Sequence, residues 1–142
     1  MSDLELTSTR VIKAPRERVF DAWTRPDILV KWWGPGEVIC PEAYIDLRVG
    51  GEYRIANRDP DGSVAWITGT FEEVVRPERL VYNWTVSFVA HAATLVTVLF
   101  NIHPEGTEVV LTHQRFADAE VRDMHAVGWA GCIDKLEALL AA

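Results

Sequence analysis

The sequence AEVRDMHAVGWAGCIDKLEALLAA, residues 119–142, forms one uninterrupted amphipathic pattern at the carboxyl end of the chain. The residues of one helical face recur every three or four positions, at His125, Gly128, Trp129, Cys132, Leu136, Leu139 and Leu140. No proline interrupts this run, so it predicts a single helix about 36 Å long at a rise of ~1.5 Å per residue. A helix of that length spans a whole sheet, and a curved sheet beneath it would leave a space between the two layers.

Short alternating segments precede this helix, and turn signals separate them. The turn signals are Gly50-Gly51, Asp59-Pro60-Asp61-Gly62, Arg76-Pro77-Glu78 and His103-Pro104-Glu105-Gly106. They delimit predicted strands at residues 43–48, 52–57, 65–74, 80–88, 94–102 and 107–114, and the alternation over residues 4–12 adds a seventh. Because the connections are too short for helical crossovers, the strands are expected to form an antiparallel sheet.

Two short helices are predicted between the first and second strands. Pro15 opens the first, where a missing amide proton costs nothing, and Pro26 opens the second, which extends to Trp32 and stops at Gly34-Pro35-Gly36. The expected order is therefore strand, two helices, six strands and one long helix, which is an α+β fold. At 142 residues the chain has the length of a single domain, spanning residues 1–142.

Composition and charge exclude several classes of partner. The formal net charge is −7 and the pI is about 5.0, without the basic footprint that nucleic acid or an anionic membrane surface requires. The sequence shows neither a signal peptide nor an apolar membrane span, so a soluble cytoplasmic protein is expected. Cys40 and Cys132 favour buried thiols, although a disulfide stays open. Four isolated histidines without a CxxC motif predict no metal site.

Alternation along the strands selects the side chains that face the long helix. The inward-facing candidates on the strands and on the helical stripe are Tyr53, Trp84, Phe100, His113, His125 and Trp129. Trp66 is ambiguous, because both faces of its strand carry apolar residues. Trp32 and Trp33 are adjacent at a helix end, so one is expected to pack inside while the other covers a gap, either as a plug or as the lid of a pocket.

His113 and His125 are the candidates for chemistry. In a functional interpretation both point into one pocket and hold a ligand or move a proton. The alternative is that each is a core or rim histidine satisfied by a backbone carbonyl. Asp46 and Arg48 share one face of a predicted strand, where they are either an ion pair that closes a pocket mouth or a solvated surface bridge.

A series of motifs runs through nearly the whole chain. The first are Ile12-x-Ala14-Pro15-Arg16-Glu17-x-Val19-Phe20-x-Ala22-Trp23-Thr24-x-Pro26, Trp32-Trp33-Gly34-Pro35 and Asp46-x-Arg48-x-Gly50-Gly51-x-Tyr53-Arg54. They are followed by Pro77-Glu78-Arg79-Leu80-Val81, Thr94-Leu95-Val96-Thr97-Val98, Gly106-Thr107-Glu108-Val109-x-Leu111-Thr112-His113 and His125-x-x-Gly128-Trp129-x-x-x-Ile133-Asp134-x-Leu136. In this order they resemble the activator of heat-shock protein 90 ATPase homologue-like family.

The resemblance implies a helix-grip fold of the START and Bet v-type superfamily. In that fold a seven-stranded antiparallel sheet wraps a long C-terminal helix, and two short helices close one end. The resemblance also implies a hydrophobic cavity between sheet and helix, in a family of lipid and small-molecule binders, some cyclases and hydrolytic enzymes. Residues 87–93 depart from the more polar hairpin of related sequences, at the edge of the expected cavity.

The leading functional hypothesis is a soluble protein, without cofactor or metal, that binds a small hydrophobic or amphipathic molecule between sheet and helix. The expected ligand-binding residues are Trp33, Tyr53, Trp66, Trp84, Phe100, His113, His125 and Trp129. The same aromatic side chains could instead simply fill the core.

Two alternatives belong to other classes. In a cyclase-type or hydrolase-type enzyme without a cofactor, His113 or His125 would act as general base, and Tyr53 or Arg48 would stabilise developing charge. A co-chaperone-like activator of the heat-shock protein 90 ATPase is disfavoured, because the chain begins directly at the helix-grip unit and lacks the additional N-terminal domain of the eukaryotic co-chaperone. The apolar residues 88–93 suggest a homodimer.

Overall fold

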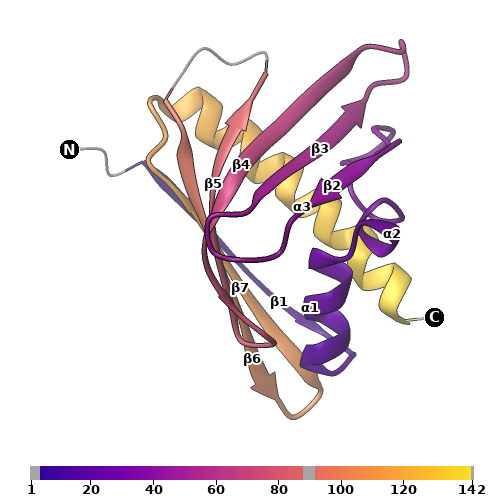
Figure 1. The fold of residues 1–142 in the computed structure, drawn as a ribbon. Coiled ribbons are helices and arrows are strands. Elements are labelled where there is room, and N and C mark those ends of the chain that lie inside the picture. The colour runs from indigo at the N-terminus through magenta and orange to yellow at the C-terminus, as the bar shows by residue number, and fades with distance from the viewer. Residues whose placement is uncertain (1–3, 88–91, 142) are drawn as a thin grey trace.

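Seven antiparallel strands form one curved sheet in the computed structural model of this protein, which describes residues 4–87 and 92–141 (Figure 1). The elements along the chain are β1 (Glu5–Ile12), α1 (Arg16–Thr24), α2 (Pro26–Leu29), β2 (Ala43–Ile45), β3 (Glu52–Arg58), β4 (Val64–Val75), β5 (Arg79–Val86), β6 (Thr94–His103), β7 (Gly106–Gln114) and α3 (Ala119–Ala141). Across the sheet the strand order is β1-β7-β6-β5-β4-β3-β2. The predicted α+β architecture and element order are confirmed.

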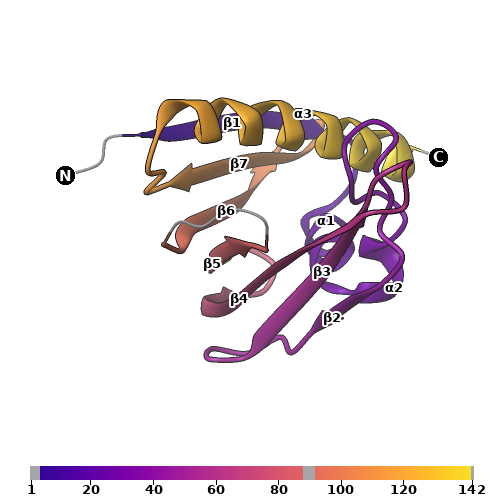
Figure 2. The same cartoon turned by 90° about the horizontal axis from the view of Figure 1, so that it is seen from above.

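The sheet curls so that its two edges lie far apart and face one another across the interior. Figure 2 shows α3 running along the β1 and β7 side, with β2 and β3 on the opposite side and with α1 and α2 closing one end. Arg10 on β1 ties the sheet edge to the helix, because its Nη1 donates to Asp134 at 2.9 Å and to Glu137 at 3.1 Å. The space between α3 and the strands β3 to β5 is therefore the place where a cavity can form.

Local sequence determines where the shorter elements stop. Pro15 occupies the cap position before α1, and Pro26 opens α2 as expected. The helix α2 ends at Leu29 and not at the predicted Trp32, although the backbone amide of Trp33 still donates to the Leu29 carbonyl at 3.0 Å. The strand β2 ends at Ile45 and not at residue 48, because the chain turns there and the Arg48 amide donates to the Asp46 carbonyl at 2.9 Å.

One of the two adjacent tryptophans packs inside the core, as the sequence predicted. Trp32 is fully buried and donates its indole N–H to the Ala22 carbonyl at 2.9 Å, which anchors it in the core beside α1. Phe100 packs at the same end of the interior, edge-on to Phe20 with 5.3 Å between ring centroids. The buried alternation of β6 ends at Phe100, because Ile102 is 78% exposed.

A seam of hydrogen bonds around Asn83 joins β4 to β5. The Asn83 side chain accepts from the Thr70 amide at 3.0 Å and donates to the Thr70 hydroxyl at 2.7 Å. Tyr53, which lies opposite Gly69 in the register of β3 and β4, donates its hydroxyl proton to the Asn83 carbonyl at 2.6 Å. Gly69 is essential here, because a Cβ at this position would lie 2.0 Å from the Asn83 carbonyl oxygen.

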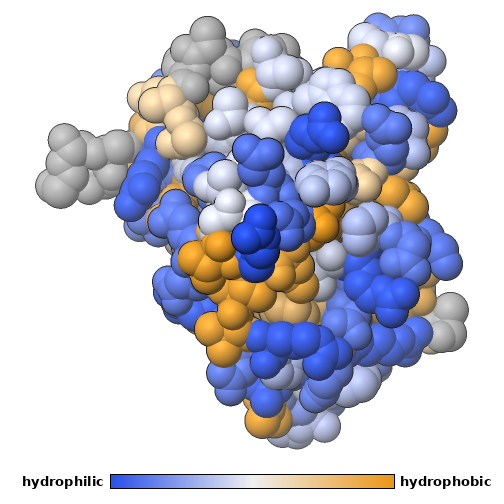
Figure 3. Space-filling view, in the orientation of Figure 1, coloured by the Kyte–Doolittle hydropathy of each residue, from blue (hydrophilic) through white to orange (hydrophobic). Residues whose placement is uncertain are grey.

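The face of the molecule in Figure 3 is largely polar. Figure 3 shows one face on which hydrophilic residues predominate and apolar side chains gather mainly near the centre. No helix among residues 4–87 and 92–141 combines the length and the apolar character needed to cross a bilayer. The dimer hypothesis and the end of the predicted strand at Phe88 involve residues 88–91, which lie outside the described residues.

Candidate ligand-binding cavity

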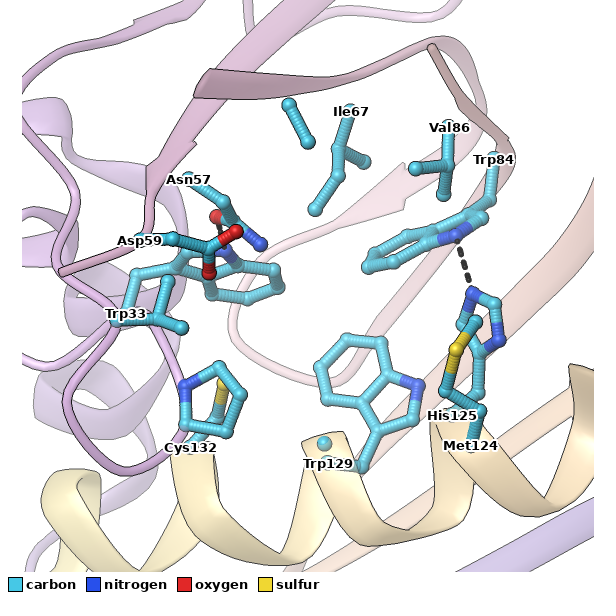
Figure 4. Close-up of a pocket in the computed structure, with 14 residues that line it drawn as sticks. Trp33, Asn57, Asp59, Ile67, Trp84, Val86, Met124, His125, Trp129 and Cys132 are labelled. Atoms are coloured by element: carbon cyan, nitrogen blue, oxygen red, sulfur yellow. Dashed lines mark hydrogen bonds between the residues drawn. The ribbon is translucent and has the colours of Figure 1, made fainter. Parts of the chain in front are cut away.

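A cavity of about 310 Å³ lies between α3 and the strands β3, β4 and β5 (Figure 4). Its lining consists of Trp33, Pro35 and Val38 from the segment after α2, Asn57 and Asp59 from the end of β3, Ala65 and Ile67 from β4, Trp84 and Val86 from β5, and Met124, His125, Gly128, Trp129 and Cys132 from α3. Most of these side chains are apolar, which is typical of small-molecule sites.

Three tryptophans form a continuous aromatic wall around this space. The ring of Trp129 lies 5.3 Å from that of Trp33 and 5.2 Å from that of Trp84, measured between centroids. The centroids of Trp33 and Trp84 are 6.0 Å apart. Because the three rings are tilted against one another and do not stack face to face, they present a concave surface of indole edges and faces, as Figure 4 shows.

Each of these three indoles uses its only polar group within the protein. Trp33 donates to Asn57 Oδ1 at 2.9 Å, Trp84 to His125 Nε2 at 3.1 Å and Trp129 to His113 Nδ1 at 3.0 Å. An indole N–H is a donor and nothing else, so these bonds leave no tryptophan hydrogen bond for a ligand. The aromatic wall therefore offers only apolar and π contacts.

The same bonds fix the tautomers of both histidines. A nitrogen that accepts from an indole carries no proton, so His113 is protonated on Nε2 and His125 on Nδ1. The His113 Nε2–H then reaches the Thr94 hydroxyl at 2.7 Å, and the His125 Nδ1–H reaches the Val121 carbonyl at 2.8 Å. All four ring nitrogens are thus engaged inside the protein, in neutral imidazoles of opposite tautomer.

Burial reinforces the neutral state. Desolvation, with a smaller contribution from the neighbouring His125, lowers the pKa of His113 to about 2. Desolvation also lowers the pKa of His125, opposed by its bond to the Val121 carbonyl. Protonating either ring would break an indole bond and place a charge against aromatic walls. The general-base role proposed for these residues would require one of these bonds to open first.

The polar groups of the cavity gather at its β3 side. Asn57 has its Oδ1 occupied by Trp33, so its Nδ2 is the end left to face a ligand. Asp59 is exposed and accepts from the Ser63 hydroxyl at 3.3 Å through Oδ2. Figure 4 shows both side chains next to Trp33, across the cavity from Trp84 and His125.

The segment after α2 closes the cavity because α3 carries a glycine where the two meet. A Cβ on Gly131 would lie 2.9 Å from the Pro35 Cβ, so only glycine lets the segment approach this closely. Lys135 fixes the same segment by donating its Nζ to the Val38 carbonyl at 3.2 Å. Gly128 one turn earlier is different, since a Cβ there would have only an ordinary contact, 4.0 Å from Pro35 Cγ.

The sequence of this chain is similar to that of a known protein family over most of its length. The sequence model of the family described as Activator of Hsp90 ATPase homolog 1-like protein matches residues 13–141. This chain belongs to that family. No curated protein matches the sequence.

Solved structures related to this family member come from several bacteria. A protein from Chromobacterium violaceum is 26% identical, with a TM-score of 0.90 and 98% of both chains covered. A protein from Nitrosomonas europaea is also 26% identical, with a TM-score of 0.84, covering 97% of this chain and 94% of that chain. The AHSA1-like protein from Aeromonas hydrophila, solved by NMR, is 26% identical with a TM-score of 0.80. The match covers 94% of this chain and 90% of that chain. These similarities confirm the helix-grip fold.

Four of the eight residues predicted to bind a ligand line the cavity of this family member, namely Trp33, Trp84, His125 and Trp129. The other four do not. Tyr53 lies deeper, beside a separate space of about 20 Å³. Phe100 packs against α1, and His113 lies behind the wall, where Trp129 and Thr94 hold it. Alternation places Tyr53, Phe100 and His113 on the inner face correctly, but packing decides how far the open space extends along a strand.

Trp66 does not line the cavity, contrary to the prediction from sequence. Ile67 lines the cavity, and successive residues of a strand point to opposite faces of the sheet. The neighbouring Trp66 therefore lies on the outer face. It lies across from Ala56 in the register of β3 and β4 and is partly exposed.

Sequence reasoning missed Asn57 and Asp59 as lining residues. Asn57 shares its parity with Tyr53 and Ile55, so a polar residue in an inward-facing set was the available signal. Asp59 follows the strand within a turn and carried no such signal.

Asp46 and Arg48 lie outside the cavity lining. They form an exposed ion pair at 2.9 Å, which is the solvated surface bridge that was one of the two interpretations of this pair. Among residues 4–87 and 92–141 no three His, Cys, Asp or Glu side chains come together as metal ligands.

The two cysteines are expected to react slowly with alkylating reagents in the folded protein. Both thiols are free and buried, and desolvation raises the pKa of Cys40 and of Cys132 to about 11. Thiolate is the reactive form, so alkylation by iodoacetamide near pH 8 should be about a hundredfold slower than in denaturant. Intact-mass measurements over time would check this, and equal rates in both conditions would contradict the burial described here.

Proposed function

We propose that this protein binds a small apolar or amphipathic molecule in the cavity between the sheet and α3. The observation that carries the proposal is the aromatic wall of Trp33, Trp84 and Trp129, whose N–H groups are all bonded away from an open space of about 310 Å³. Such a wall offers contact area without a desolvation penalty for buried donors. The volume lies at the lower end of the range for small-molecule pockets.

The proposal favours binding over catalysis. His125 is the only lining histidine among the described residues, and both of its ring nitrogens are already bonded. His113 has no nitrogen free either. A general base needs a free lone pair within reach of a substrate proton. The arrangement therefore suits a rigid aromatic container better than a proton-transfer site.

Filling the cavity from the helix side tests this proposal. In Gly128→Leu the new side chain enters the cavity without a backbone clash, because a Cβ there meets only Pro35 at an ordinary distance. We expect at least a tenfold loss of affinity for the neutral apolar probe N-phenyl-1-naphthylamine, measured by fluorescence titration. The melting temperature should stay the same or rise, because leucine favours helix over glycine by about 0.8 kcal/mol.

The matched control is Ala130→Leu, which adds a similar side chain to the exposed face of the same helix and should leave probe affinity unchanged. Ala65→Leu narrows the cavity from β4 and serves as an independent second variant. If neither cavity variant lowers the affinity for the probe, or if the wild-type protein does not bind the probe, the proposed site is wrong.

A further inference from the structure

The charge on the cavity lining is negative. Asp59 is the only charged side chain that lines it among the described residues, and it forms no ion pair with any of them. Within residues 4–87 and 92–141, no lysine or arginine contributes to the lining. Lys135 is close to this region, but its Nζ is bonded to the Val38 carbonyl at 3.2 Å. The net charge of −7 adds a negative background field.

Among the described residues, the uncharged polar groups of the lining offer a ligand a single donor. Asn57 presents Nδ2, a donor that has no partner within the described part of the chain, while its Oδ1 already accepts one bond from Trp33. His125 cannot donate to a ligand, since its single N–H is bonded to Val121. At this side of the cavity a ligand therefore meets one neutral donor, Asn57 Nδ2 near the end of β3, and one carboxylate, Asp59, just after that strand.

We propose that the cavity selects aromatic or cyclic molecules that carry an amine and discriminates against those that end in a carboxylate. The ring part lies against the indole wall, the amine faces Asp59, and a neutral acceptor can reach Asn57 Nδ2. An ammonium group here is attracted both by the carboxylate and by indole faces within about 6 Å. A carboxylate in the same place is repelled by Asp59 and finds no cation in the lining. This inference rests on the proposed function and names the ligand class of the same site.

Three probes that share one ring system test the inference. They are 2-(naphthalen-2-yl)ethylamine, 2-(naphthalen-2-yl)ethanol and the carboxylate of (naphthalen-2-yl)acetic acid. Each is titrated calorimetrically near pH 7.5 at low ionic strength. We expect the amine to bind at least about tenfold more tightly than the carboxylate, with the alcohol between them. The ratio should shrink in high salt, because the Asp59 end of the cavity is open to solvent.

Asp59→Asn assigns the preference to its source. This variant should reduce the amine-to-carboxylate ratio to about twofold, whereas the alcohol should keep its affinity. Asp61→Asn is the matched control, because it removes the same charge from the same turn without altering the cavity lining. It should keep the wild-type ratio.

The outcomes separate this inference from the proposed function. If the alcohol binds and Gly128→Leu weakens it, but the carboxylate binds as well as the amine, only the charge inference is wrong. A preference for the amine that survives in Asp59→Asn also overturns it. If none of the three probes binds, both the inference and the proposed function are contradicted.

Discussion

Lowering the pH from 6.5 to about 4.5 is expected to reduce the free energy of unfolding by about 2 kcal/mol through His113 alone. Burial lowers the pKa of this residue from 6.5 to about 2 in the folded protein. Below pH 6.5 the unfolded chain therefore binds a proton at this position that the folded protein does not bind. Stability from this source is constant above pH 6.5 and is lost as the pH falls. The lowered pKa of His125 acts in the same direction.

His113→Gln isolates this effect. Glutamine can accept from the Trp129 indole and donate to the Thr94 hydroxyl, so it imitates the neutral tautomer without titrating. Denaturant unfolding should be measured at a series of pH values. Below pH 6.5 the free energy of unfolding should fall less steeply with falling pH in the variant than in the wild type, by about 1.4 kcal/mol per pH unit. The region above pH 7 is the internal control, where the two curves should be parallel. Equal slopes below pH 6.5 would contradict the indole-bonded neutral histidine.

Gly69→Ala is expected to destabilise the protein by about 3 to 5 kcal/mol. The added methyl group would lie 2.0 Å from the Asn83 carbonyl oxygen and 2.7 Å from its Oδ1, so the β4–β5 seam must open. Opening it also disturbs the bonds that Asn83 makes with Thr70 and Tyr53. Because both strands form the cavity wall, ligand binding should weaken together with stability.

Gly128→Ala is the matched comparison for this prediction. It makes the same chemical change in α3, where the Cβ has only an ordinary contact, and it should stabilise the protein by about 0.5–1 kcal/mol. Chemical denaturation of both variants checks the pair. A Gly69→Ala variant as stable as the wild type would show that β4 and β5 do not approach as closely as described here.

Most of the fold could be predicted from the sequence, because its signals are local and agree with one another. The stripe from His125 to Leu140 became one helix, and the turn signals separated the strands within one or two residues of their observed bounds. The exceptions have local causes. The predicted second strand ended early where the chain turns at Asp46, and the second helix gave way to a turn before Trp32.

The site could be predicted only in part, because alternation fixes direction but not depth. Trp84 and Tyr53 both face inward, yet only Trp84 borders the open space, since Tyr53 reaches across Gly69 to the Asn83 carbonyl. The role of His113 depended on a bond to Trp129, sixteen positions away. No periodicity reports such a bond. The sequence left both interpretations of the histidines open, and the three-dimensional pairing of each with an indole distinguishes them.

The most direct test of ligand binding in this cavity is a ¹H–¹⁵N spectrum of the six tryptophan indole groups during titration with 2-(naphthalen-2-yl)ethanol. We expect the three lining indoles, Trp33, Trp84 and Trp129, to shift most, because the ring currents of a bound naphthalene act at short range. Trp66 on the outer face should not move. Saturable binding that shifts Trp66 and leaves the three lining indoles unchanged would contradict the proposed cavity, as would the absence of any saturable shift.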